Sequence, residues 1–509
     1  MKSVHINQMG YRPHDIKKAV IPEKSASFCV LRVCDEESVY EGTAGEGVEY
    51  AVGGESVRVA DFSGITDVGE YMICAGGKRS HAFKIGDDPY AGLRTALLDF
   101  FNFQKCGVDV ECGTWSHPAC HAEPATVYGL PIKKDVSGGW HDAGDYGRYI
   151  VVAAKAVADL LFANELAQKR DDNLLDTVWF ELEWMLKMQD EKSGGVYHKV
   201  SCHNFNALNE MPHHEKNELV LSPISATATA TFAATMALAS RSFPQKRDEL
   251  LNVARRAWAW CIANPDAPNF ANPEGITTGG YGDRDDKDER FWAACALFAA
   301  TGESAFHEFI KASEIYTGLG WANVGTYGIV SYLYHARQFS DVQLAARMKD
   351  ALHTLCKKIM HEYRIDPYGI SLGDDYKWGS NMTVANNAMT LLLARPFAQL
   401  SEEYTQAAWE HLHYLLGRNP LSQSYITGFG ANPPKYPHHR PSEAVGAPMP
   451  GMVVGGPNKF ITQDPALKEY CEGNPPAKCY IDHAHSFAGN EVTIYWNSPV
   501  YFMAAVLGV

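Results

Sequence analysis

Two aspartates stand close together in the segment GGWHDAGDYGRY, residues 138–149. Asp142 and Asp145 follow two glycines and a tryptophan, and an apolar run with helical spacing comes directly after them. Aspartate is a favoured N-cap, so the simplest role for Asp145 is to cap a helix over residues 146–166. Two carboxylates beside a tryptophan and paired glycines are harder to explain as caps. They are better suited to holding one water molecule between them.

A second acidic position occurs near the C-terminus, in the segment YIDHAHSFAGNEVTIYWNSPVY at 480–501. Glu491 stands where the last apolar run starts, so we expect it to begin the final helix, where capping is again the simplest role. The neighbouring residues Asn490, Trp496 and Asn497 lie in an otherwise hydrophobic stretch. Such surroundings raise the pKa of a carboxyl group, as a general acid near neutral pH requires.

A third polar segment, SYITGFGANPPKYPHHRPS at 424–442, is rich in glycine and proline and is expected to form a rigid loop. It carries His438, His439 and Arg440. A single histidine is more often structural than catalytic. A histidine and an arginine two positions apart on a rigid loop can instead hydrogen-bond the neighbouring hydroxyl groups of a sugar.

These segments need a scaffold, and the hydrophobic periodicity predicts two different ones. Residues 1–86 contain short runs rich in Val, Ile, Phe and Tyr between turns, which predicts a small antiparallel β-sandwich with a structural or docking role. Beyond residue 86 the apolar spacing becomes helical and predicts about twelve helices. Several of these helices are apolar nearly all round, as in the inner ring of a double ring of helices. The polar segments fall in the long loops, where function is expected.

Composition narrows the class of protein further. The chain has 509 residues, 46% of them hydrophobic, and a formal net charge of −15. That charge argues against nucleic acid or an anionic membrane as a partner, because both require basic patches. No signal-peptide pattern and no membrane-spanning apolar run occur in the sequence, so a cytoplasmic location is expected.

The three polar segments together resemble glycoside hydrolase family 9, which contains cellulases and related β-1,4-glycan hydrolases. Ser424–Arg440 fits the family pattern S-x-I-T-x-x-G-x-N-x₄-P-H-x-R, and Tyr480–Ser498 fits Y-x-D-x₄-F-x₃-E-x-T-x₃-N-S. The GGWHDAGDYGRY segment is similar to the family's W-x-D-A-G-D segment. The opening INQMGYRP, residues 6–13, resembles the immunoglobulin-like module that precedes the catalytic domain in one branch. The resemblance covers essentially the whole chain.

The resemblance implies an (α/α)₆ barrel over residues 87–509, preceded by an immunoglobulin-like module over residues 1–86. It also implies hydrolysis with inversion, for which two carboxyl groups roughly 6.5–9.5 Å apart are needed. Carried over by position, Asp145 is the general base, Asp142 helps to orient the water and Glu491 is the general acid. Asp482 supports Glu491 or its loop. His438 and Arg440 hold the sugar at the cleavage point.

The chain departs from the family pattern at three places: Ser486 replaces a frequent Asp, Trp496 a frequent Tyr, and His141 a frequent Tyr. These changes leave the expected chemistry intact and affect the shape of the sugar subsites. Candidate aromatic platforms for sugar rings are Trp378, Trp496, Tyr376 and Trp321, although a single tryptophan is more often part of a core.

Two metal sites are expected. The segment KCGVDVECGTWSHPACHAE supplies Cys106, Cys112, Cys120 and His121, and His141 follows beside the aspartates. Two thiolates and two imidazoles make a closed structural zinc site, and zinc is frequent in this branch of the family. We favour the ligands Cys106, Cys120, His121 and His141, with Cys112 as the alternative. The acidic run DRDDKDE at 283–289 suggests calcium at Asp288 and Glu289, although a solvated acidic turn would look the same.

The favoured substrate is a β-1,4-linked glucan or cello-oligosaccharide. An exo-acting enzyme on another β-1,4 glycan, such as a glucosaminidase on chitosan oligosaccharides, remains open, because acidic groups in the segment 202–225 could recognise an amine. Two other classes are a zinc-dependent hydrolase with His141 and Asp142 as metal ligands, and a glycan-binding protein without catalysis. No organic cofactor is expected.

Overall fold

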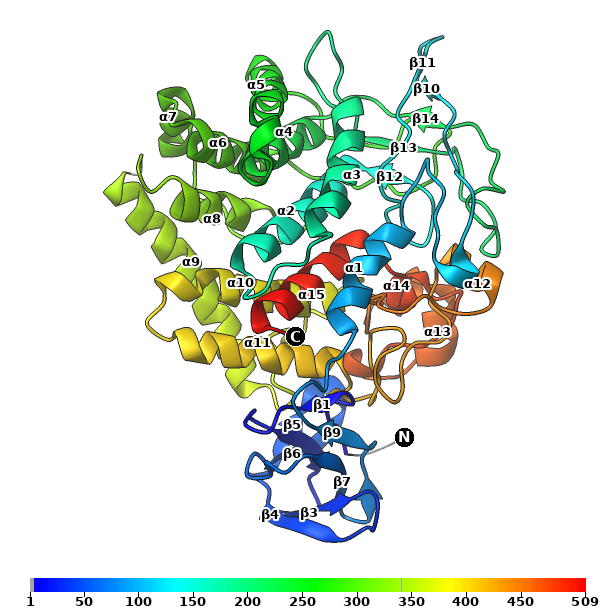
Figure 1. Cartoon of the computed structure of the whole chain (residues 1–509), viewed down its shortest axis with the longest axis vertical. Helices are drawn as coiled ribbons and strands as arrows, with labels where there is room; N and C mark the ends of the chain where they lie inside the picture. Colours follow the sequence, from blue (N-terminus) through cyan, green and yellow to red (C-terminus); the bar gives the residue numbers. More distant parts are fainter. Residues whose placement is uncertain (1–3, 340) are drawn as a thin grey trace. The chain divides into compact units, whose positions relative to one another are not determined.

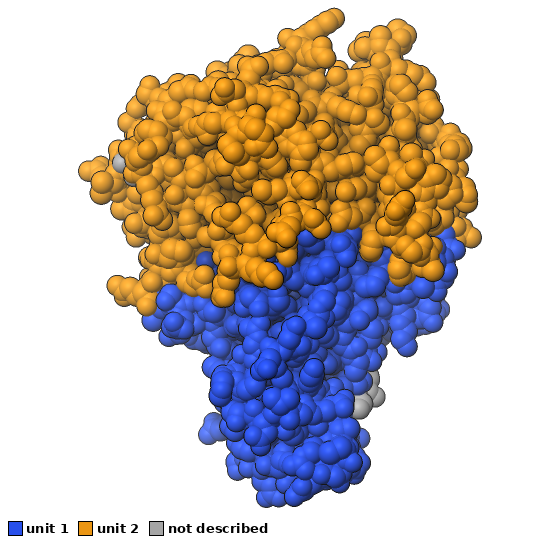
Figure 2. All heavy atoms as spheres, viewed as in Figure 1, with its two compact units in different colours: residues 1–100, 358–392, 400–509 blue, residues 101–357, 393–399 orange. Residues whose placement is uncertain are grey.

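The computed structural model describes residues 4–339 and 341–509, and the chain divides into two compact units. Unit 1 contains residues 1–100, 358–392 and 400–509, and unit 2 contains residues 101–357 and 393–399 (Figure 2). Each unit therefore combines segments that are distant in the sequence. Asp142 and Asp145 belong to unit 2, and Glu491 belongs to unit 1.

Unit 1 begins with a β-sandwich, drawn in blue in Figure 1. The larger sheet has the strand order β1-β9-β7-β3-β4 with β8 paired to β7, and the smaller sheet has the order β2-β6-β5. The strands are β1 Gly10–Tyr11, β2 Lys18–Pro22, β3 Ser27–Arg32, β4 Ser38–Thr43, β5 Val48–Tyr50, β6 Glu55–Asp61, β7 Gly69–Ala75, β8 Lys78–Arg79 and β9 Phe83–Ile85.

Alternation of apolar and polar residues sets the two faces of each sheet. Val30 on β3 and Ile73 on β7 are directly paired and point into the core, where they meet Ile21 of the smaller sheet. The residues next to them along each strand point away from the core. The strand pairs are antiparallel as predicted, except that β1 pairs with β9 in parallel.

Polar contacts fasten the sandwich to the helical part of unit 1. The hydroxyl groups of Tyr50 and Tyr376 are 2.7 Å apart, and both side chains are buried. The Glu55 carboxylate accepts hydrogen bonds from Tyr368 and Lys478, each at 2.9 Å. Tyr376 is thus part of the attachment of the sandwich.

Unit 2 contains inner and outer helices. The inner helices α2 (Ile150–Leu166), α4 (Ala226–Ser242), α6 (Lys287–Thr301) and α8 (Gly325–His335) are buried over most of their length. They pack in the order α2, α4, α6, α8 (Figure 1). The outer helices α3 (Leu174–Lys187), α5 (Arg247–Ala263) and α7 (Ser304–Ala312) pack against α2, α4 and α6 in turn. The all-round apolar sequences therefore occupy the inner positions, as predicted.

The loops of unit 2 form a sheet of short strands that the sequence did not predict. Its strand order is β11-β10-β14-β13-β12. The strands are β10 Ala125–Val127, β11 Lys133–Lys134, β12 Arg148–Tyr149, β13 Lys199–Ser201 and β14 Val220–Leu221. β12 leads directly into α2, so this sheet fixes the entry to the helix that follows the aspartates.

The remaining helices lie mostly in unit 1; α9 passes from unit 2 into unit 1, and the last residues of α1 and α10 belong to unit 2. They are α1 Leu93–Phe103, α9 Val342–Ile365, α10 Ser380–Ala394, α11 Ser401–Leu415, α12 Arg440–Val445, α13 Pro465–Cys471, α14 Phe487–Asn490 and α15 Ile494–Leu507. The twelve long helices match the predicted runs, and the short helices α12 to α14 lie inside predicted loops. Among the described residues, no helix has the length and apolar character needed to cross a membrane.

Candidate active site

Asp142 and Asp145 lie in an irregular loop ahead of β12, and neither of them caps a helix. α2 begins at Ile150, with Tyr149 at the N-cap and no side-chain cap, so the helix expected from residue 146 starts later. The loop approaches α3 closely, because a Cβ atom at Gly139 would lie 2.6 Å from the ring of Trp184. The aspartates are therefore positioned by tertiary packing and are available for another role.

Asp142 is 1% exposed and accepts a hydrogen bond of 2.5 Å from the hydroxyl group of Tyr281. Burial raises the pKa of the Asp142 carboxyl well above its usual range, the Tyr281 hydrogen bond opposes this, and the nearby charge of Asp145 adds to it. The other oxygen, Oδ1, has no hydrogen-bond partner among the described residues. One oxygen is thus anchored while the second is left to bind a water or a substrate hydroxyl group.

Asp145 is 7% exposed, and its Oδ2 accepts a hydrogen bond of 3.0 Å from the backbone N–H of Gly147. The buried ammonium group of Lys199 is close enough for its charge to act on Asp145. Burial lowers the pKa of Lys199 to about 8, and Asp145 opposes this shift. The Asp145 carboxylate thus has a buried cation beside it.

Tyr281 is a functional residue that the sequence did not single out. Its backbone has φ of 49°, a left-handed conformation that is unfavourable for a residue with a side chain. The two residues before Tyr281 are held by hydrogen bonds from Lys199, the first residue of β13, and from His198, the residue before that strand. His198 lies 2.9 Å from the Gly280 carbonyl, and Lys199 donates to the Gly279 carbonyl at 2.5 Å. These contacts offset the strain and point the Tyr281 hydroxyl at Asp142.

The predicted zinc ligands Cys106, Cys120, His121 and His141 are brought together. One ligand atom from each lies within 4.8 Å of all the others, and among the described residues this is the only group of three or more such side chains. His141 Nε2 is 3.7 Å from Cys120 Sγ. Cys112 does not belong to the group, so the alternative ligand is excluded.

The ligand His121 has a carboxylate behind it. Its Nε2 is 3.1 Å from a carboxylate oxygen of Glu215, and its Nδ1 has no partner among the described residues. This leaves Nδ1 as the metal-binding atom and fixes the ring from the other side, as is typical of metal-bound histidines. Glu215 is a second residue that the sequence did not single out. It belongs to the long segment 202–225.

Backbone pairing joins the metal-binding segment to the aspartate loop. Cys106 donates its backbone N–H to the Gly139 carbonyl at 2.9 Å, and His141 donates to the Gln104 carbonyl at 2.7 Å. The side-chain amide of Gln104 then donates to the carbonyl groups of His141 and Ala143. Asp142, between those two residues, is therefore held by the same contacts that hold two of the cysteine and histidine ligands.

A separate acidic cluster lies at the start of α6. Burial raises the pKa of Asp283, Asp288 and Glu289, and for Glu289 the shift is large, with the charge of Asp288 as the next cause. Glu289 is 0% exposed, and neither carboxylate oxygen has a partner among the described residues. A buried carboxylate without a donor is costly, and a bound cation would remove that cost.

In unit 1, Glu491 lies between α14 and α15. α15 begins at Ile494 with Thr493 as its N-cap, so the expectation that Glu491 begins the last helix is wrong. The Glu491 backbone is extended and pairs in parallel with His438. The His438 N–H donates to the Asn490 carbonyl at 2.8 Å, and the Gly455 N–H donates to the Glu491 carbonyl at 3.0 Å. Glu491 is thus fixed by the loop that carries His438 and Arg440.

Asp482 and Asn490 hold these two segments together. The Asp482 carboxylate accepts hydrogen bonds from the backbone N–H groups of Lys435 and Tyr436, at 2.7 and 2.9 Å. It also accepts a hydrogen bond of 3.0 Å from the Asn490 side chain. Asn490 in turn accepts one from Tyr480 at 2.7 Å. Asp482 therefore supports both the histidine loop and the residue before Glu491.

His438 presents a neutral imidazole. Burial lowers its pKa to about 4, and its Nδ1 is 2.6 Å from the Ala484 carbonyl oxygen. Because a carbonyl oxygen only accepts, Nδ1 carries the proton and Nε2 is an acceptor. Arg440 is buried at the first position of α12. Together they offer one acceptor and one cationic donor.

The aromatic candidates differ in exposure. Trp378 is 42% exposed and remains a possible platform for a sugar ring. Trp321 in unit 2 is partly buried and packs edge-on against Tyr281. Trp496 and Tyr376 are 2% and 0% exposed, so neither offers a free face, and the expectation that they bind substrate is wrong. Trp496 fits closely against Gly379 and Gly455, and Tyr376 bonds to Tyr50.

The comparisons with known proteins decide the family. Residues 90–504 match the model of glycosyl hydrolase family 9, and residues 1–80 match that of the cellulase N-terminal ig-like domain. The chain belongs to glycosyl hydrolase family 9. It is therefore a glycoside hydrolase, and it is 35% identical to a cellodextrinase of Butyrivibrio fibrisolvens, over 99% of both proteins.

Solved structures of the family extend the similarity over the whole chain. The structure of AaCel9A in complex with cellobiose-like isofagomine is 38% identical, covers 100% of both chains and has a TM-score of 0.94. A structure titled as a Zn-binding triple mutant of the family 9 endoglucanase J30 is 29% identical, covers 98% of this chain and 99% of the other, and has a TM-score of 0.92. The predicted fold class, an (α/α)₆ barrel preceded by an immunoglobulin-like sandwich, is thereby confirmed.

The contact between Tyr281 and Asp142 generates a first prediction. Tyr281→Phe keeps the ring and removes the hydroxyl group, so Asp142 loses its buried donor and is held less precisely. We expect kcat on a soluble glycan substrate to fall by about tenfold, less than the roughly 10²- to 10⁴-fold contributed by a group that itself transfers the proton, because Tyr281 acts only through Asp142. KM should change little. Steady-state kinetics measure both.

Tyr128→Phe is a matched control, because the Tyr128 hydroxyl also donates to a neighbour, the Glu274 carbonyl, but at an exposed position. It should leave kcat unchanged. Equal losses in the two variants, or an unchanged kcat in Tyr281→Phe, would contradict a positioning role for Tyr281.

Proposed function

We propose that this protein hydrolyses β-1,4-linked glucans, with cello-oligosaccharides as preferred substrates, and that it inverts the anomeric configuration. Asp145 acts as the general base and Glu491 as the general acid. The observation that carries the proposal is the buried aspartate pair, in which Tyr281 anchors one oxygen of Asp142 and the other oxygen is unpartnered. The cellodextrinase named above, similar over 99% of both chains, supports the choice of substrate.

The base side of the reaction requires a water molecule held against the sugar. Asp145 takes a proton from that water as the water oxygen attacks the anomeric carbon. Asp142 Oδ1 accepts a hydrogen bond from the second hydrogen of the same water. The buried Lys199 ammonium lies near Asp145 on the same side of the site. Attack by water on the face opposite the leaving group reverses the anomeric configuration.

The acid side requires proton donation to the oxygen that leaves. Glu491 gives its proton to the glycosidic oxygen as the bond to the anomeric carbon breaks. Neutral His438 accepts a hydrogen bond from a sugar hydroxyl group through Nε2, and Arg440 donates to a second hydroxyl. Asp482 and Asn490 act through these residues, because they hold the backbone on both sides.

The alternatives are less well supported by the side chains that they need. Recognition of an amine by segment 202–225 requires free acidic groups, and of its three glutamates Glu215 pairs with His121 and Glu218 accepts a hydrogen bond from Thr126, which leaves Glu210 for such a role. A catalytic zinc held by His141 and Asp142 is disfavoured because His141 faces the thiol ligands, whereas Asp142 bonds to Tyr281.

Replacing either proposed catalytic carboxyl should abolish most turnover. Asp145→Asn and Glu491→Gln keep the side-chain shape, and each should lower kcat on cellotetraose by a factor of about 10² to 10⁴. Glu443→Gln, on α12 behind Arg440, is a control that should keep wild-type activity. Product analysis by NMR should give α-anomeric products early in the wild-type reaction.

Early β-anomeric products would refute inversion. Activity on chitosan oligosaccharides but not on cello-oligosaccharides would refute the preferred substrate. Full activity of Glu491→Gln together with loss of activity on chelation would instead favour the zinc hydrolase.

We also propose that Cys106, Cys120, His121 and His141 bind a structural zinc ion. The donor set of two thiols and two imidazoles suits tetrahedral zinc and leaves no position for a substrate. The free Nδ1 of His121, with Glu215 behind Nε2, further supports metal binding. The bound ion would cross-link the 104–121 segment to the aspartate loop and so keep Asp142 in place.

Metal analysis tests this proposal. The purified wild-type chain should contain about one zinc ion, and Cys120→Ser should lose it and unfold at a lower temperature, because the four ligands no longer have a common partner. Glu215→Gln should keep zinc but bind it roughly 10- to 100-fold more weakly in competition with a chelator. Cys112→Ser is the control and should bind zinc normally. A zinc-free wild-type chain, or a zinc-replete Cys120→Ser, would contradict the assignment.

The acidic pair Asp288 and Glu289 at the start of α6 is proposed to bind calcium. Added Ca²⁺ should raise the unfolding temperature of the wild-type protein, because the ion compensates the buried Glu289 carboxylate. Glu289→Gln should abolish this shift, whereas Glu303→Gln, at an exposed position near the other end of α6, should not. An equal Ca²⁺ shift in all three proteins would exclude this cluster as the site.

A further inference from the structure

Two cysteines face each other across neighbouring strands of the sandwich. Cys29 on β3 is the direct antiparallel partner of Cys74 on β7. Glu41 on β4 is the direct partner of Cys29, and Arg79 on β8 is the direct partner of Cys74. A single row across four strands therefore reads Glu41, Cys29, Cys74, Arg79, with both thiols in the middle.

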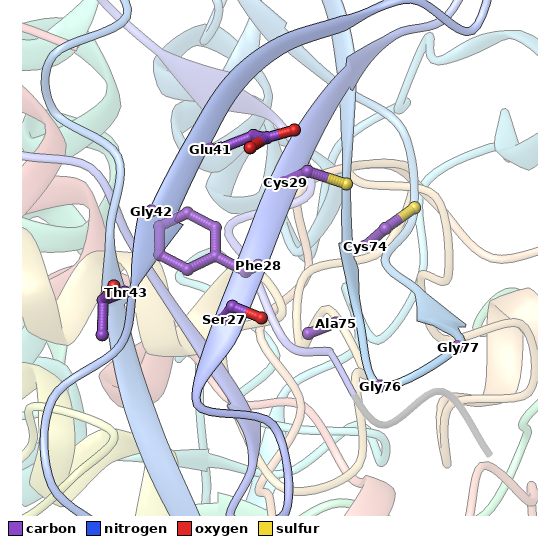
Figure 3. Close-up of a pocket in the computed structure, with 10 residues that line it drawn as sticks. All are labelled: Ser27, Phe28, Cys29, Glu41, Gly42, Thr43, Cys74, Ala75, Gly76 and Gly77. Atoms are coloured by element: carbon purple, nitrogen blue, oxygen red, sulfur yellow. The ribbon is translucent and has the colours of Figure 1, made fainter.

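The row lies on the face of the sheet that points away from the core. Val30 and Ile73, the next residues along the two strands, are buried in the core, so Cys29 and Cys74 project to the opposite side. Figure 3 shows the two side chains on adjacent strands. They line a shallow hollow of about 620 Å³. Both cysteines are partly exposed, so a small thiol reagent can reach them.

The spacing suits a covalent link. Directly opposed residues in an antiparallel pair have Cα atoms roughly 4.5–5.5 Å apart, and a disulfide needs roughly 4.4–6.8 Å. The sulfur atoms already influence one another, because burial and the neighbouring Cys29 raise the pKa of the Cys74 thiol, while Arg79 opposes this. The Arg79 guanidinium is itself paired with Glu36, which reduces its influence on the thiol.

We propose that Cys29 and Cys74 are a site of reversible oxidative cross-linking, at which a disulfide oxidant converts the two thiols into one intramolecular disulfide. With glutathione disulfide, one cysteine thiolate attacks a sulfur of the oxidant and releases one glutathione thiolate. The second cysteine, as its thiolate, then attacks the protein sulfur of the mixed disulfide and releases the second glutathione. The two cysteines lose two electrons and two protons, and one oxidant becomes two thiols.

Other cysteines of the chain are less suited to this reaction. Cys471 and Cys479 are also neighbours, but both are buried in an apolar cluster, and the Cys479 thiol donates to the carbonyl groups of Asn474 and Pro475. Metal binding by Cys29 and Cys74 is disfavoured, since the only convergent group of three or more ligands among the described residues is the one around His141.

The cross-link would act on the stability of the sandwich. It would close a loop from β3 to β7 that contains β4, β5 and β6, so it would restrict the unfolded chain while leaving an existing strand pair in place. We therefore expect the oxidised module to unfold at a higher temperature, and a reductant to reverse the effect. The proposal is independent of the catalytic assignment.

The test uses the full-length protein and its thiol content. The chain has 12 cysteines. Incubation of the wild-type protein with glutathione disulfide, alkylation under denaturing conditions and peptide mass spectrometry should reveal a peptide pair joined at Cys29 and Cys74. The joined pair should disappear with dithiothreitol. Thermal unfolding should move up by a few degrees on oxidation and return on reduction.

Cys29→Ser and Cys74→Ser should each lose the joined pair and the thermal shift, while Cys34→Ser, which removes an exposed thiol of the same module, should keep both. Each single variant should instead keep a stable glutathione adduct on the remaining cysteine, as the two-step exchange requires. Persistence of both free thiols in the wild-type protein, a stable adduct there instead of the joined pair, or a joined pair at Cys471 and Cys479 alone would overturn the proposal.

Discussion

Two carboxyl groups that are close together in a buried loop are energetically unfavourable, and the contacts around this loop in unit 2 offset that cost. The charge of Asp145 and burial both raise the pKa of the Asp142 carboxyl, and burial removes the water that would otherwise weaken the repulsion. Such a loop relaxes unless its neighbours fix it at several points. Backbone pairing at Cys106 and His141, the Gln104 amide and the Tyr281 hydroxyl provide those points. These contacts come from two distant parts of the sequence, residues 104–106 and Tyr281.

The same principle explains the histidine and cysteine cluster beside the loop. Four ligand side chains converge on a position that is continuous, through the backbone, with the aspartates. A metal ion at this position would join the four side chains through four metal–ligand bonds. Glu215 extends the arrangement outward, because it ties the long segment 202–225 to His121. The cysteine and histidine group and the segment 202–225 are thus directly connected.

In unit 1, hydrogen bonds hold the segment that carries Glu491, whereas in unit 2 a bound metal ion would help to hold the aspartate loop. Glu491 has no helix to hold it, and its backbone is fixed by pairing with His438 and by the Gly455 N–H. Asp482 gathers two backbone N–H groups and the Asn490 amide. A polar network of this kind is stable in a buried place only when every member has partners, which holds for Asp482 and Asn490.

Much of the fold was predictable, because long helices and alternating strands carry strong periodicity. The twelve long helices and the strands KAVIP and GEYMICA were found at or within a few residues of their observed bounds. The convergence of Cys106, Cys120, His121 and His141 was predicted from residue type, spacing and the family resemblance. The start of α15 was missed because the sequence shows no break between Glu491 and Ile494. The helix begins after Thr493, whose side chain caps it, and a threonine at that position does not stand out in the sequence.

What the sequence could not reveal depends on contacts between distant residues. Tyr281 meets Asp142 only after the chain folds, and Glu215 meets His121 in the same way. The left-handed backbone at Tyr281 leaves no signal, because such a conformation normally points to glycine. Burial of Trp496 and Tyr376 was likewise invisible, since a tryptophan or tyrosine in a polar segment looks the same whether it faces solvent or a neighbouring glycine.

The unusual backbone of Tyr281 has a consequence for how this enzyme can change over generations. Glycine at that position would relax the chain and make the folded state more stable, but it would remove the only group that the structure offers to Asp142 from this loop. Selection for durability and selection for turnover would therefore choose different residues at one site. Enzymes of this design can be expected to carry such a compromise wherever a strained residue supports a catalytic one.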